Sequence, residues 1–392
     1  MVEPVDELSD AQSGRATARK QRRRSGHICQ VVHGLTVGGA ERLAATLGRF
    51  ASARHRVSFV CLDELGELGG VLRHDGYRVE VLDRGAGVSL SCARRLSRYF
   101  RDESVDLAHA HQYTPFFYSL AARGPRRGPP VIFTEHGRWH PDYPRRKRML
   151  FNRIFLSKRD RLVGVGEAVR QALIVNEGLP AQRVEVIYNG VDLSRFDFVE
   201  GRRQRARAAL GLGPEQLAIL QVARLDHLKD HGTALKTMRR VVNELPDARL
   251  LLVGDGPERG AIESMIGELN LAPQVRLLGT RHDIPELLAA ADLFLLTSIS
   301  EGIPLTLIEA QAAGRPVVST AVGGVAEIVP PAHAMLAPAG DDAELARHVL
   351  ELARHPAQRA QMAEQGRERA RAMFSEEQML ASYERMYSEL LT

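Results

Sequence analysis

The sequence predicts an α/β protein with two doubly wound parallel-sheet domains. Three observations predict this class: a length of 392 residues, an ordinary composition with 44% hydrophobic and 26% charged residues, and short apolar strands that alternate with helix-period segments. About 150 residues form a typical domain, so this length allows two or three domains, each with its own core. More than ten strands in one sheet would be unusual, so two sheets in two domains fit better.

The predicted strands are short runs of β-branched and other apolar residues. Several are continuously apolar rather than alternating, which is typical of parallel strands with helices on both faces. The strands are Ile28–Val32, Val57–Leu62, Val79–Leu82, Val131–Thr134, Arg161–Val165, Val184–Tyr188, Leu217–Val222, Leu250–Val253, Val275–Leu278, Leu293–Thr297 and Pro316–Ser319. The helix-period segments are Gly39–Phe50, Leu90–Phe100, Thr233–Asn243, Glu258–Glu268 and Ala343–Leu352. A turn signal at 189–192 predicts a boundary between a domain over 26–192 and a second domain that begins at 193.

The composition excludes several classes of protein. No run of 18 apolar residues exists, so no spanning helix is expected. Residues 1–25 are acidic, then basic, without an apolar stretch, which predicts a disordered basic tail rather than a secretory signal. Cys29, Cys61 and Cys92 are odd in number and lack CxxC spacing. They favour a reducing, cytoplasmic compartment without a zinc site.

The net charge of +5 is unevenly distributed. Residues 1–192 hold 31 Lys and Arg against 21 Asp and Glu, whereas residues 193–392 hold 22 against 27. A basic first half predicts an anionic surface or substrate there. The densest cluster, Arg145–Arg161, interleaves with Leu150, Phe151, Ile154 and Phe155, which share one helix face. Two interpretations remain: a helix that binds anionic lipid, or a stripe that packs into the core with solvated charges, which is slightly favoured.

Ligands of open α/β sheets bind beyond the carboxyl ends of the strands, so each strand-to-helix junction is a candidate site. At the first junction, Gly38 and Gly39 precede a helix and allow backbone N–H groups to approach an anion. Asp63 follows the second strand, as in a dinucleotide site, but the glycine spacing is not GxGxxG. Ligand contact is favoured here over a plain tight turn.

A second junction holds Arg224 and Lys229 just past an apolar strand. An arginine fork and a compact ammonium group would bind a diphosphate. The alternative is a surface ion pair of Lys229 with Asp226 or Asp230. The third junction, Gly254–Pro257, is fully explained as a structural turn.

The fourth junction is the most informative because it holds two carboxylates around a helix start. Free N–H groups at the start of this helix favour an anion. Gly302, Ile303 and Leu305 carry such N–H groups, whereas Pro304, which is placed at the start of the helix, has none. Glu301 lies on the loop, and Glu309 lies about a turn inside the helix, where a carboxylate is costly without a partner. Each could accept two hydroxyls of a diol, whereas a capping acid plus a solvated glutamate explains only one of them.

Histidines end two strands of the first domain. His109 and His111 point the same way along one strand, but no third metal ligand follows at a sensible spacing. Hydrogen-bonding roles are therefore preferred, and His136 is the better candidate for the active site. No GxSxG, HExxH or Walker sequence supports a hydrolase, zincin or P-loop protein.

In this order, the segments resemble glycosyltransferase family 4, the retaining nucleotide-sugar transferases of GT-B fold. The resemblance runs from about His27 to Ser388, and the complete series is far more specific than any single motif. One departure is Asp230-His231, where the family very often has glycine, and it leaves the local loop shape open. The motifs are Gly38–Arg42, Glu135–Gly137, Ile187–Asp192, Arg224-Leu225 with Lys229, Gly254–Pro257, Glu301–Glu309, Gly314–Val318, Val322–Gly324 and Glu327.

The resemblance implies roles for the residues that bind the donor. Arg224 and Lys229 would hold the donor diphosphate and stabilise the leaving nucleotide. Glu309 would bind the ribose hydroxyls. Glu301 would contact hydroxyls of the donor sugar, helped by backbone N–H groups at Gly302–Leu305.

The resemblance also implies an architecture and a reaction. Two Rossmann-like domains, with the second at 193–373, would face each other across a cleft, and a helix at 374–392 would cross back onto the first. Gly38 and Gly39 would approach the phosphates and the acceptor, and His136 would face the transferred sugar. The acceptor would attack the face that the diphosphate leaves, and a phosphate oxygen would take its proton. Neither a protein nucleophile nor a divalent metal or other cofactor is expected beside the nucleotide-diphosphate sugar.

The leading hypothesis is a cytoplasmic enzyme, peripheral on the inner face of the membrane, with a lipid-linked or polysaccharide acceptor. A transferase with a small soluble acceptor, or a nucleotide-sugar epimerase of the same fold, is the alternative. A different class would be a nucleic-acid-binding protein that uses the basic run Arg15–Arg24. The candidate donor-binding residues argue against that class, so no nucleic-acid partner is expected.

Overall fold

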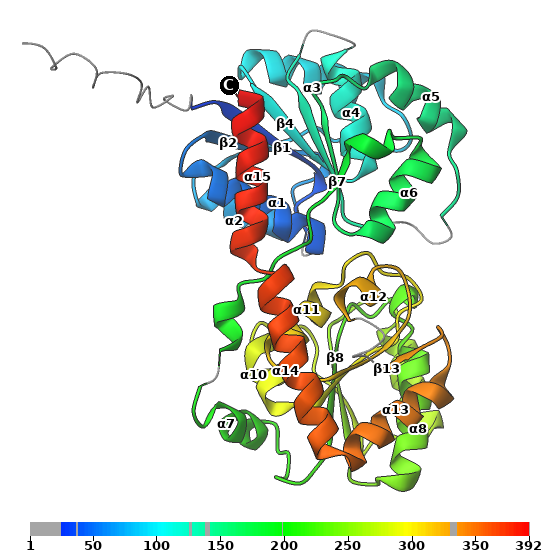
Figure 1. Ribbon diagram of the computed structural model, residues 1–392. Helices are drawn as coiled ribbons and strands as arrows, with labels where there is room; N and C mark the ends of the chain where they lie inside the picture. Colours follow the sequence, from blue (N-terminus) through cyan, green and yellow to red (C-terminus); the bar gives the residue numbers. More distant parts are fainter. Residues whose placement is uncertain are drawn as a thin grey trace, which may run out of the picture.

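A computed structural model describes residues 25–36, 38–124, 128–137, 142–197, 199–329 and 335–391. It contains two parallel β-sheets, one above the other in Figure 1, and helices cover both faces of each sheet. The predicted fold class is therefore confirmed. All but the last residue of the predicted tail, including its basic run, lies outside the described residues.

The first sheet has seven parallel strands in the order β3-β2-β1-β4-β5-β6-β7. Its strand order reverses between β1 and β4, which is the switch point where doubly wound sheets bind ligands. Along β1, Ile28 and Val32 pack on one face of the sheet, and Cys29 and Val31 pack on the other. The strands are β1 (His27–Gly34), β2 (Arg56–Glu64), β3 (Arg78–Val81), β4 (Leu107–His111), β5 (Val131–Glu135), β6 (Arg161–Gly164) and β7 (Val184–Val186).

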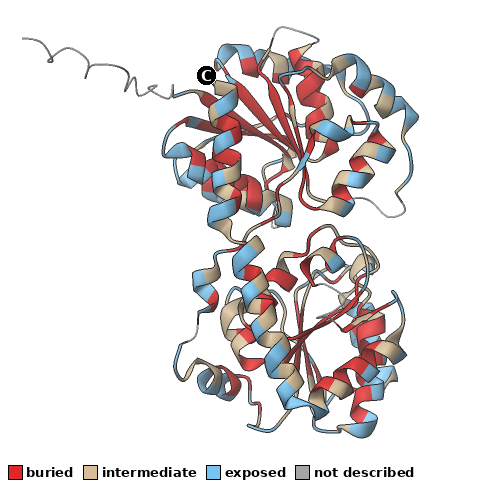
Figure 2. Cartoon of the chain, in the orientation of Figure 1, coloured by how far each residue is buried: buried red, intermediate tan, exposed pale blue. Residues whose placement is uncertain are grey.

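Two layers of helices enclose this sheet, and Figure 2 shows their buried sides turned toward it. Helices α1 and α2 pack on one face together with the C-terminal helix α15, whereas α3, α4 and α6 pack on the other. The helices are α1 (Gly39–Ser52), α2 (Gly66–His74), α3 (Leu90–Asp102), α4 (Tyr113–Arg123), α5 (Arg146–Phe155), α6 (Glu167–Glu177) and α15 (Glu376–Leu391), with a 3₁₀ turn η1 (Ala181–Arg183).

The second sheet has six parallel strands in the order β10-β9-β8-β11-β12-β13, with its switch point between β8 and β11. The last strand was not predicted, because Met335–Ala337 contains no β-branched residue. The strands are β8 (Ala218–Val222), β9 (Arg249–Val253), β10 (Val275–Leu277), β11 (Leu293–Leu296), β12 (Val317–Thr320) and β13 (Met335–Ala337). The helices are α7 (Arg202–Ala209), α8 (His231–Glu244), α9 (Arg259–Glu268), α10 (Ile284–Ala290), α11 (Leu305–Ala312), α12 (Val325–Ile328), α13 (Asp342–Arg354) and α14 (Pro356–Met373), with 3₁₀ turns η2 (Leu193–Phe196) and η3 (His227–Lys229).

The chain crosses between the sheets twice, and the two crossings lie side by side. Val191 donates its N–H to the carbonyl of Phe374 at 3.0 Å and accepts one from Glu376 at 3.1 Å. A Cβ at Gly190 would lie 2.5 Å from the carbonyl oxygen of Ser375, so only glycine fits this approach. Beyond the crossing, α15 runs back along the first sheet (Figure 1). Four of its side chains join the core there: Met379, Tyr383, Met386 and Tyr387.

Candidate active site

The carboxyl ends of the two sheets meet at the loops that follow β5 and β11. A Cβ at Gly302 would lie 2.4 Å from the carbonyl oxygen of His136 and 3.1 Å from the Cα of Gly137. Only a glycine allows this approach without displacing one of the loops. The structure thus brings the predicted His136 of the first half next to the predicted loop 301–305 of the second half.

Lys229 and Glu301 form an ion pair across two loops of the second sheet. The Nζ of Lys229 lies 2.7 Å from Oε1 of Glu301, and the hydroxyl of Ser298 donates to the same oxygen at 2.6 Å. Lys229 does not pair with Asp226 or Asp230, so the alternative of a local surface ion pair is wrong. The Glu301 side chain is 7% exposed, and its Oε2 has no partner among the described residues. One carboxylate oxygen is thus held in place while the other is left available.

Asp230 occupies the position where the family commonly has glycine, and its backbone explains that preference. Its φ of 42° is left-handed, a conformation that aspartate tolerates better than most side chains. Its carboxylate also caps α8, because it accepts the N–H of Thr233 at 3.1 Å and the hydroxyl of Thr233 at 2.6 Å. The loop therefore keeps the backbone shape that a glycine would adopt, and Lys229 stays in register.

Arg224 lies on a loop that packs against the turn after β9. The N–H of Leu225 donates to the carbonyl of Asp255 at 3.0 Å. A Cβ at Gly254 would lie 2.0 Å from the carbonyl oxygen of Ala223, and the φ of 138° at Gly254 is a second reason for glycine. The turn read from the sequence as structural thus supports the loop that carries Arg224. The Arg224 side chain is 70% exposed, with only a 3.8 Å ion pair to Asp226 among the described residues.

The start of α11 offers unpartnered backbone N–H groups. Helix α11 begins at Leu305, and no side chain caps it. Gly302, Ile303 and Leu305 have no acceptor for their N–H groups among the described residues, and Pro304 has no N–H. The helix ends at Ala312, two residues before Gly314, whose φ is 63°. These donors and the helix dipole make the predicted anion-binding position available.

Glu309 lies on α11, and its carboxylate has no hydrogen-bond or ion-pair partner among the described residues. Burial raises the pKa of Glu309, and the positive charges of Arg195 and Arg42 oppose that shift. Arg42 belongs to the first turn of α1, directly after Gly38 and Gly39. The predicted glycine loop of the first half, Gly38 and Gly39, therefore lies near Glu309 of the second half. A Cβ at Gly39 would meet nothing within 4 Å, so sterics do not require glycine there.

His109, His111 and His136 form a stacked row inside the first half. The rings of His109 and His111 are 4.3 Å apart, and those of His111 and His136 are 5.2 Å apart. Burial lowers the pKa of His109 and of His136 to about 3, and it holds the pKa of His111 well below its usual range. All three are hence neutral near pH 7. Hydrogen-bond partners were expected for these residues, and each of them has one.

Glu327 joins the two halves, a role that its place in the sequence does not suggest. Its carboxylate accepts the N–H groups of Glu167 at 2.6 Å and Ala168 at 2.7 Å, and the hydroxyl of Tyr188 at 3.0 Å. Glu327 thus caps α6 of the other half, whose own N-cap is Gly166 and has no side chain. The sequence shows that α6 starts after Gly166, which has no side chain to cap it. It does not reveal which distant acid supplies the cap.

Asp63 does not serve as a free ribose-binding acid. Arg84 donates to both of its oxygens, at 2.7 Å and 3.1 Å, and His33 lies 3.1 Å from Oδ2. The dinucleotide-like interpretation of this position is therefore wrong. Both carboxylate oxygens are already engaged by neighbouring side chains.

The basic helix α5 divides its apolar residues between two faces. Phe151 and Phe155 stack at 4.4 Å and pack against the core, whereas Leu150 and Ile154 are 61% and 60% exposed. The prediction of one shared apolar face is wrong in this respect. Arg148 is also engaged inward, because it pairs with Glu177 at 2.9 Å. Five further cations are exposed and have no ion pair among the described residues: Arg146, Lys147, Arg153, Lys158 and Arg159.

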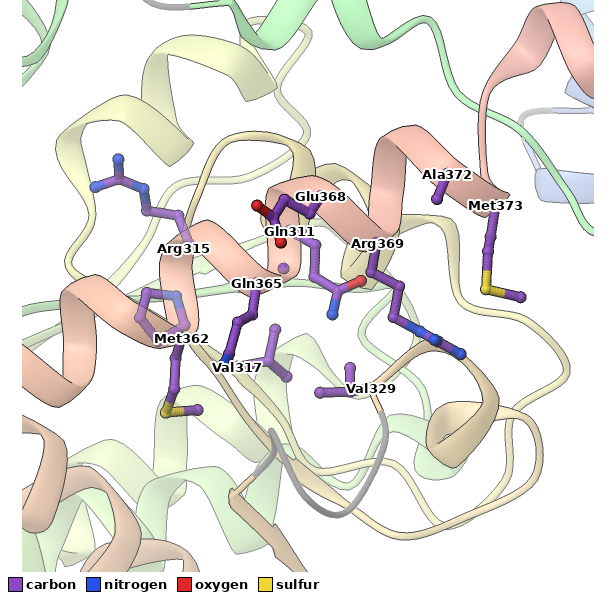
Figure 3. Close-up of a pocket in the computed structure, with 12 residues that line it drawn as sticks. Gln311, Arg315, Val317, Val329, Met362, Gln365, Glu368, Arg369, Ala372 and Met373 are labelled. Atoms are coloured by element: carbon purple, nitrogen blue, oxygen red, sulfur yellow. The ribbon is translucent and has the colours of Figure 1, made fainter.

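A separate pocket of about 440 Å³ lies between α14 and the α11–β12 region (Figure 3). Gln311, Val317 and Met362 are among the residues that line it, and none of the predicted site residues does. It is therefore not part of the candidate active site. Within the described ranges, no group of three His, Cys, Asp or Glu residues is arranged to hold a metal ion. None of the described helices is long and apolar enough to cross a membrane.

Two facing doubly wound sheets, with loops from both in contact at their carboxyl ends, define the GT-B class of fold. Comparison with known families identifies the lineage. The profile described as Glycosyltransferase Family 4 matches residues 37–195, and that described as Glycosyl transferases group 1 matches residues 202–369. The chain belongs to glycosyltransferase family 4 and is a glycosyltransferase.

Individual relatives agree with this assignment. The chain is 29% identical over 305 residues to the putative glycosyltransferase EpsF of Bacillus subtilis, which covers 74% of this chain and 77% of that protein. It is 28% identical over 236 residues to an Escherichia coli UDP-Gal:alpha-D-GlcNAc-diphosphoundecaprenol alpha-1,3-galactosyltransferase, covering 58% of this chain and 61% of the relative. Anabaena Alr3699/HepE in complex with UDP superposes with a TM-score of 0.81 and 22% identity, covering 93% of this chain and 100% of that one.

Proposed function

We propose that this enzyme transfers a sugar from a nucleoside-diphosphate sugar to a lipid-linked or polysaccharide acceptor. The observation that carries the proposal is the set of charges at the carboxyl edge of the second sheet. Lys229 and Glu301 are paired at 2.7 Å, and the carboxylate of Glu309 has no partner among the described residues. A ligand that carries both phosphates and hydroxyl groups satisfies this set, because the cations attract phosphate and the carboxylates accept hydroxyl hydrogen bonds.

In this proposal, Arg224 and Lys229 hold the donor diphosphate. The 3.8 Å ion pair of Arg224 with Asp226 is long and exposed, so turning the guanidinium toward a phosphate costs little. Lys229 is held by Glu301 through one N–H, which leaves two donors for the phosphate oxygens. The N–H groups around Gly302–Leu305 add further donors with a favourable helix dipole.

The carboxylates and His136 bind the sugar parts of the donor. Glu309 accepts the ribose hydroxyls, which supply the partners that its half-buried carboxylate lacks. Glu301 points its unengaged oxygen at a hydroxyl of the transferred sugar, and Lys229 and Ser298 fix its orientation. His136, in backbone contact with Gly302, faces the same sugar from the first half.

The proposed reaction breaks the bond between the anomeric carbon and the diphosphate oxygen. The acceptor hydroxyl forms its bond to that carbon on the same face, and its proton passes to an oxygen of the departing diphosphate. The cations and backbone N–H groups stabilise the charge that develops on this leaving group, and they are in place before the reaction begins. No residue of the chain forms a covalent bond in this route, and we propose no divalent metal.

A surface around α5 is proposed to contact anionic lipid, which would bring the enzyme to a lipid-linked acceptor at the cytoplasmic face of a membrane. Leu150 and Ile154 are exposed one helical turn apart, next to unpaired cations such as Arg146 and Lys147. Apolar side chains inserted among headgroups, with cations above anionic phosphates, are the usual basis of such binding. The relative whose name includes a diphosphoundecaprenol acceptor supports a lipid-linked substrate.

A thermal-shift screen of the full chain against nucleotide sugars tests the donor proposal. A donor at 100 times its dissociation constant should raise the stability by about 2.7 kcal/mol. Product analysis with the best donor, with and without acceptor, then separates transfer from epimerisation and lipid from small soluble acceptors. If no nucleotide sugar shifts the transition, the donor proposal is wrong.

Co-sedimentation with vesicles tests the lipid contact. The double variant Arg146→Glu/Lys147→Glu should lose binding to vesicles with anionic lipid. Lys236→Glu/Arg239→Glu on α8 changes the net charge equally and should bind as the wild type does. Equal loss in both variants would mean that net charge alone, rather than this surface, governs binding.

A further inference from the structure

A chain of hydrogen bonds links the C-terminal helix to His136. The Nε2 of Gln30 lies 3.4 Å from the hydroxyl of Tyr387, and its Oε1 lies 2.8 Å from Nε2 of His111. The Nδ1 of His111 lies 3.0 Å from Nε2 of His136. Gln30, His111 and Tyr387 are buried, so solvent does not compete for these bonds.

With the Gln30 amide oriented as in the structure, the chemistry of the groups sets the direction of each bond. The Oε1 of Gln30 can only accept, so the Nε2 of His111 carries the proton and donates it. A neutral histidine has one N–H, so the Nδ1 of His111 must accept from the Nε2–H of His136. The Nδ1 of His136 then carries a lone pair, and it has no partner among the described residues. Both rings are neutral because burial keeps the pKa of His111 and of His136 far below 7.

The orientation of one amide decides this order. If the Gln30 amide turned over, His111 would accept at Nε2 and donate from Nδ1, and His136 would present an N–H rather than a lone pair. In the observed orientation the Tyr387 hydroxyl accepts from Gln30, and its one proton is directed to Nδ1 of His109, which lies 2.8 Å away. The opposite nitrogen of His109 donates to the hydroxyl of Thr134 at 2.9 Å.

We propose that Gln30, anchored by Tyr387 of α15, is a positioning residue that selects the Nε2–H tautomer of His136. His136 then accepts a hydrogen bond from a substrate hydroxyl at Nδ1, and it cannot donate one there. This inference rests on the proposed function only for the identity of that hydroxyl. In this proposal α15 does more than pack against the core. The tautomer of His136, at the junction of the two sheets, depends on Tyr387 of this helix.

Nitrogen NMR of the full chain with ¹⁵N-labelled histidine tests the tautomer without any substrate. Protonated and unprotonated ring nitrogens resonate in separate regions, and the His136 signals are assigned by their loss in His136→Asn. The wild type should show a protonated Nε2 and an unprotonated Nδ1 at neutral pH. The reverse assignment would overturn the proposal, and it would do so even if no sugar donor were ever found.

The variant Tyr387→Phe tests the anchor, with Tyr383→Phe as its matched control. Tyr383 lies on the same face of α15, but among the described residues its hydroxyl bonds only to Thr134, at 3.2 Å, and not to Gln30. Tyr387→Phe should give His136 a mixture of tautomers and lower kcat/KM by roughly 2- to 10-fold, while nucleotide affinity stays constant. Tyr383→Phe should change neither the tautomer nor kcat/KM. An unchanged tautomer in Tyr387→Phe would refute the role of this residue.

Discussion

Replacing Glu309 by Gln should weaken nucleotide binding and stabilise the free enzyme. The carboxylate is half-buried on α11, burial raises its pKa, and no described residue pairs with it. An uncompensated charge of this kind destabilises the folded state until a ligand arrives. The substitution keeps the shape of the side chain and removes only the charge, so it separates electrostatics from packing.

The two effects have different magnitudes. A hydrogen bond to a charged group contributes about 1.5–3 kcal/mol, so the loss of one at the ribose weakens UDP binding by about 10- to 150-fold. Removal of an unfavourable group at a functional site commonly stabilises by about 0.5–2 kcal/mol. For a domain of this size that corresponds to roughly 2–4 °C per kcal/mol in the unfolding midpoint.

Calorimetric titration with UDP and thermal unfolding of the free protein measure both effects. Glu268→Gln on α9, where the glutamate is exposed, is the control and should change neither. Because the folded-state pKa of Glu309 is raised, the folded state binds more protons than the unfolded state between pH 4.5 and that raised pKa, so the penalty grows through this range and is complete above it. The stability gain should therefore vanish as the pH falls to the ordinary value of 4.5. A variant that binds UDP normally and unfolds at a lower temperature would refute this account.

Three further predictions concern the contact between the two sheets and the stacked histidines. Gly302→Ala should lower transfer by roughly 10- to 100-fold, because its Cβ would displace the loop of His136. Gly260→Ala on α9, with open space around it, should keep full activity, and equal activity of both variants would contradict the prediction. Glu327→Ala removes the acceptor of three hydrogen bonds between the halves, so small-angle scattering should show a larger radius of gyration; an unchanged radius would exclude a latch. The three stacked histidines stay neutral when folded but bind protons below pH 6.5 when unfolded, so the free energy of unfolding in urea should fall from pH 7 to pH 5. The slope reaches at most about 4 kcal/mol per pH unit for three protons, and a flat profile would mean that the folded histidines also bind protons.

The fold was predictable because it depends on local patterns. Apolar runs predicted most strands, and the rule that ligands bind at carboxyl ends singled out Lys229, Glu301 and Glu309. Partners were not predictable, because they depend on which distant segments meet. The sequence placed Lys229 beside Asp226 and Asp230, whereas its ion pair is with Glu301, 72 residues away.

The polar network behind His136 lay beyond any sequence pattern. Gln30 and Tyr387 are 357 residues apart and meet only because the last helix returns to the first sheet. In the sequence, a glutamine within an apolar strand and a tyrosine on an amphipathic helix both look like ordinary core positions. Only the hydrogen bonds between them distinguish a network from two isolated polar residues.

The charge asymmetry shows why composition indicates a property of a domain but does not locate a site. Several cations of the first half are engaged by carboxylates of the same half, since Arg84 binds Asp63, Arg123 binds Asp160 and Arg148 binds Glu177. The exposed cations of α5 remain, and they lie on a helix surface rather than at the junction of the sheets. The proposed phosphate-binding cations, Arg224 and Lys229, belong to the second half, where acidic residues outnumber basic ones. Binding a dianion there depends on position, because a cation within a few ångströms of the phosphate outweighs dispersed charges that solvent screens.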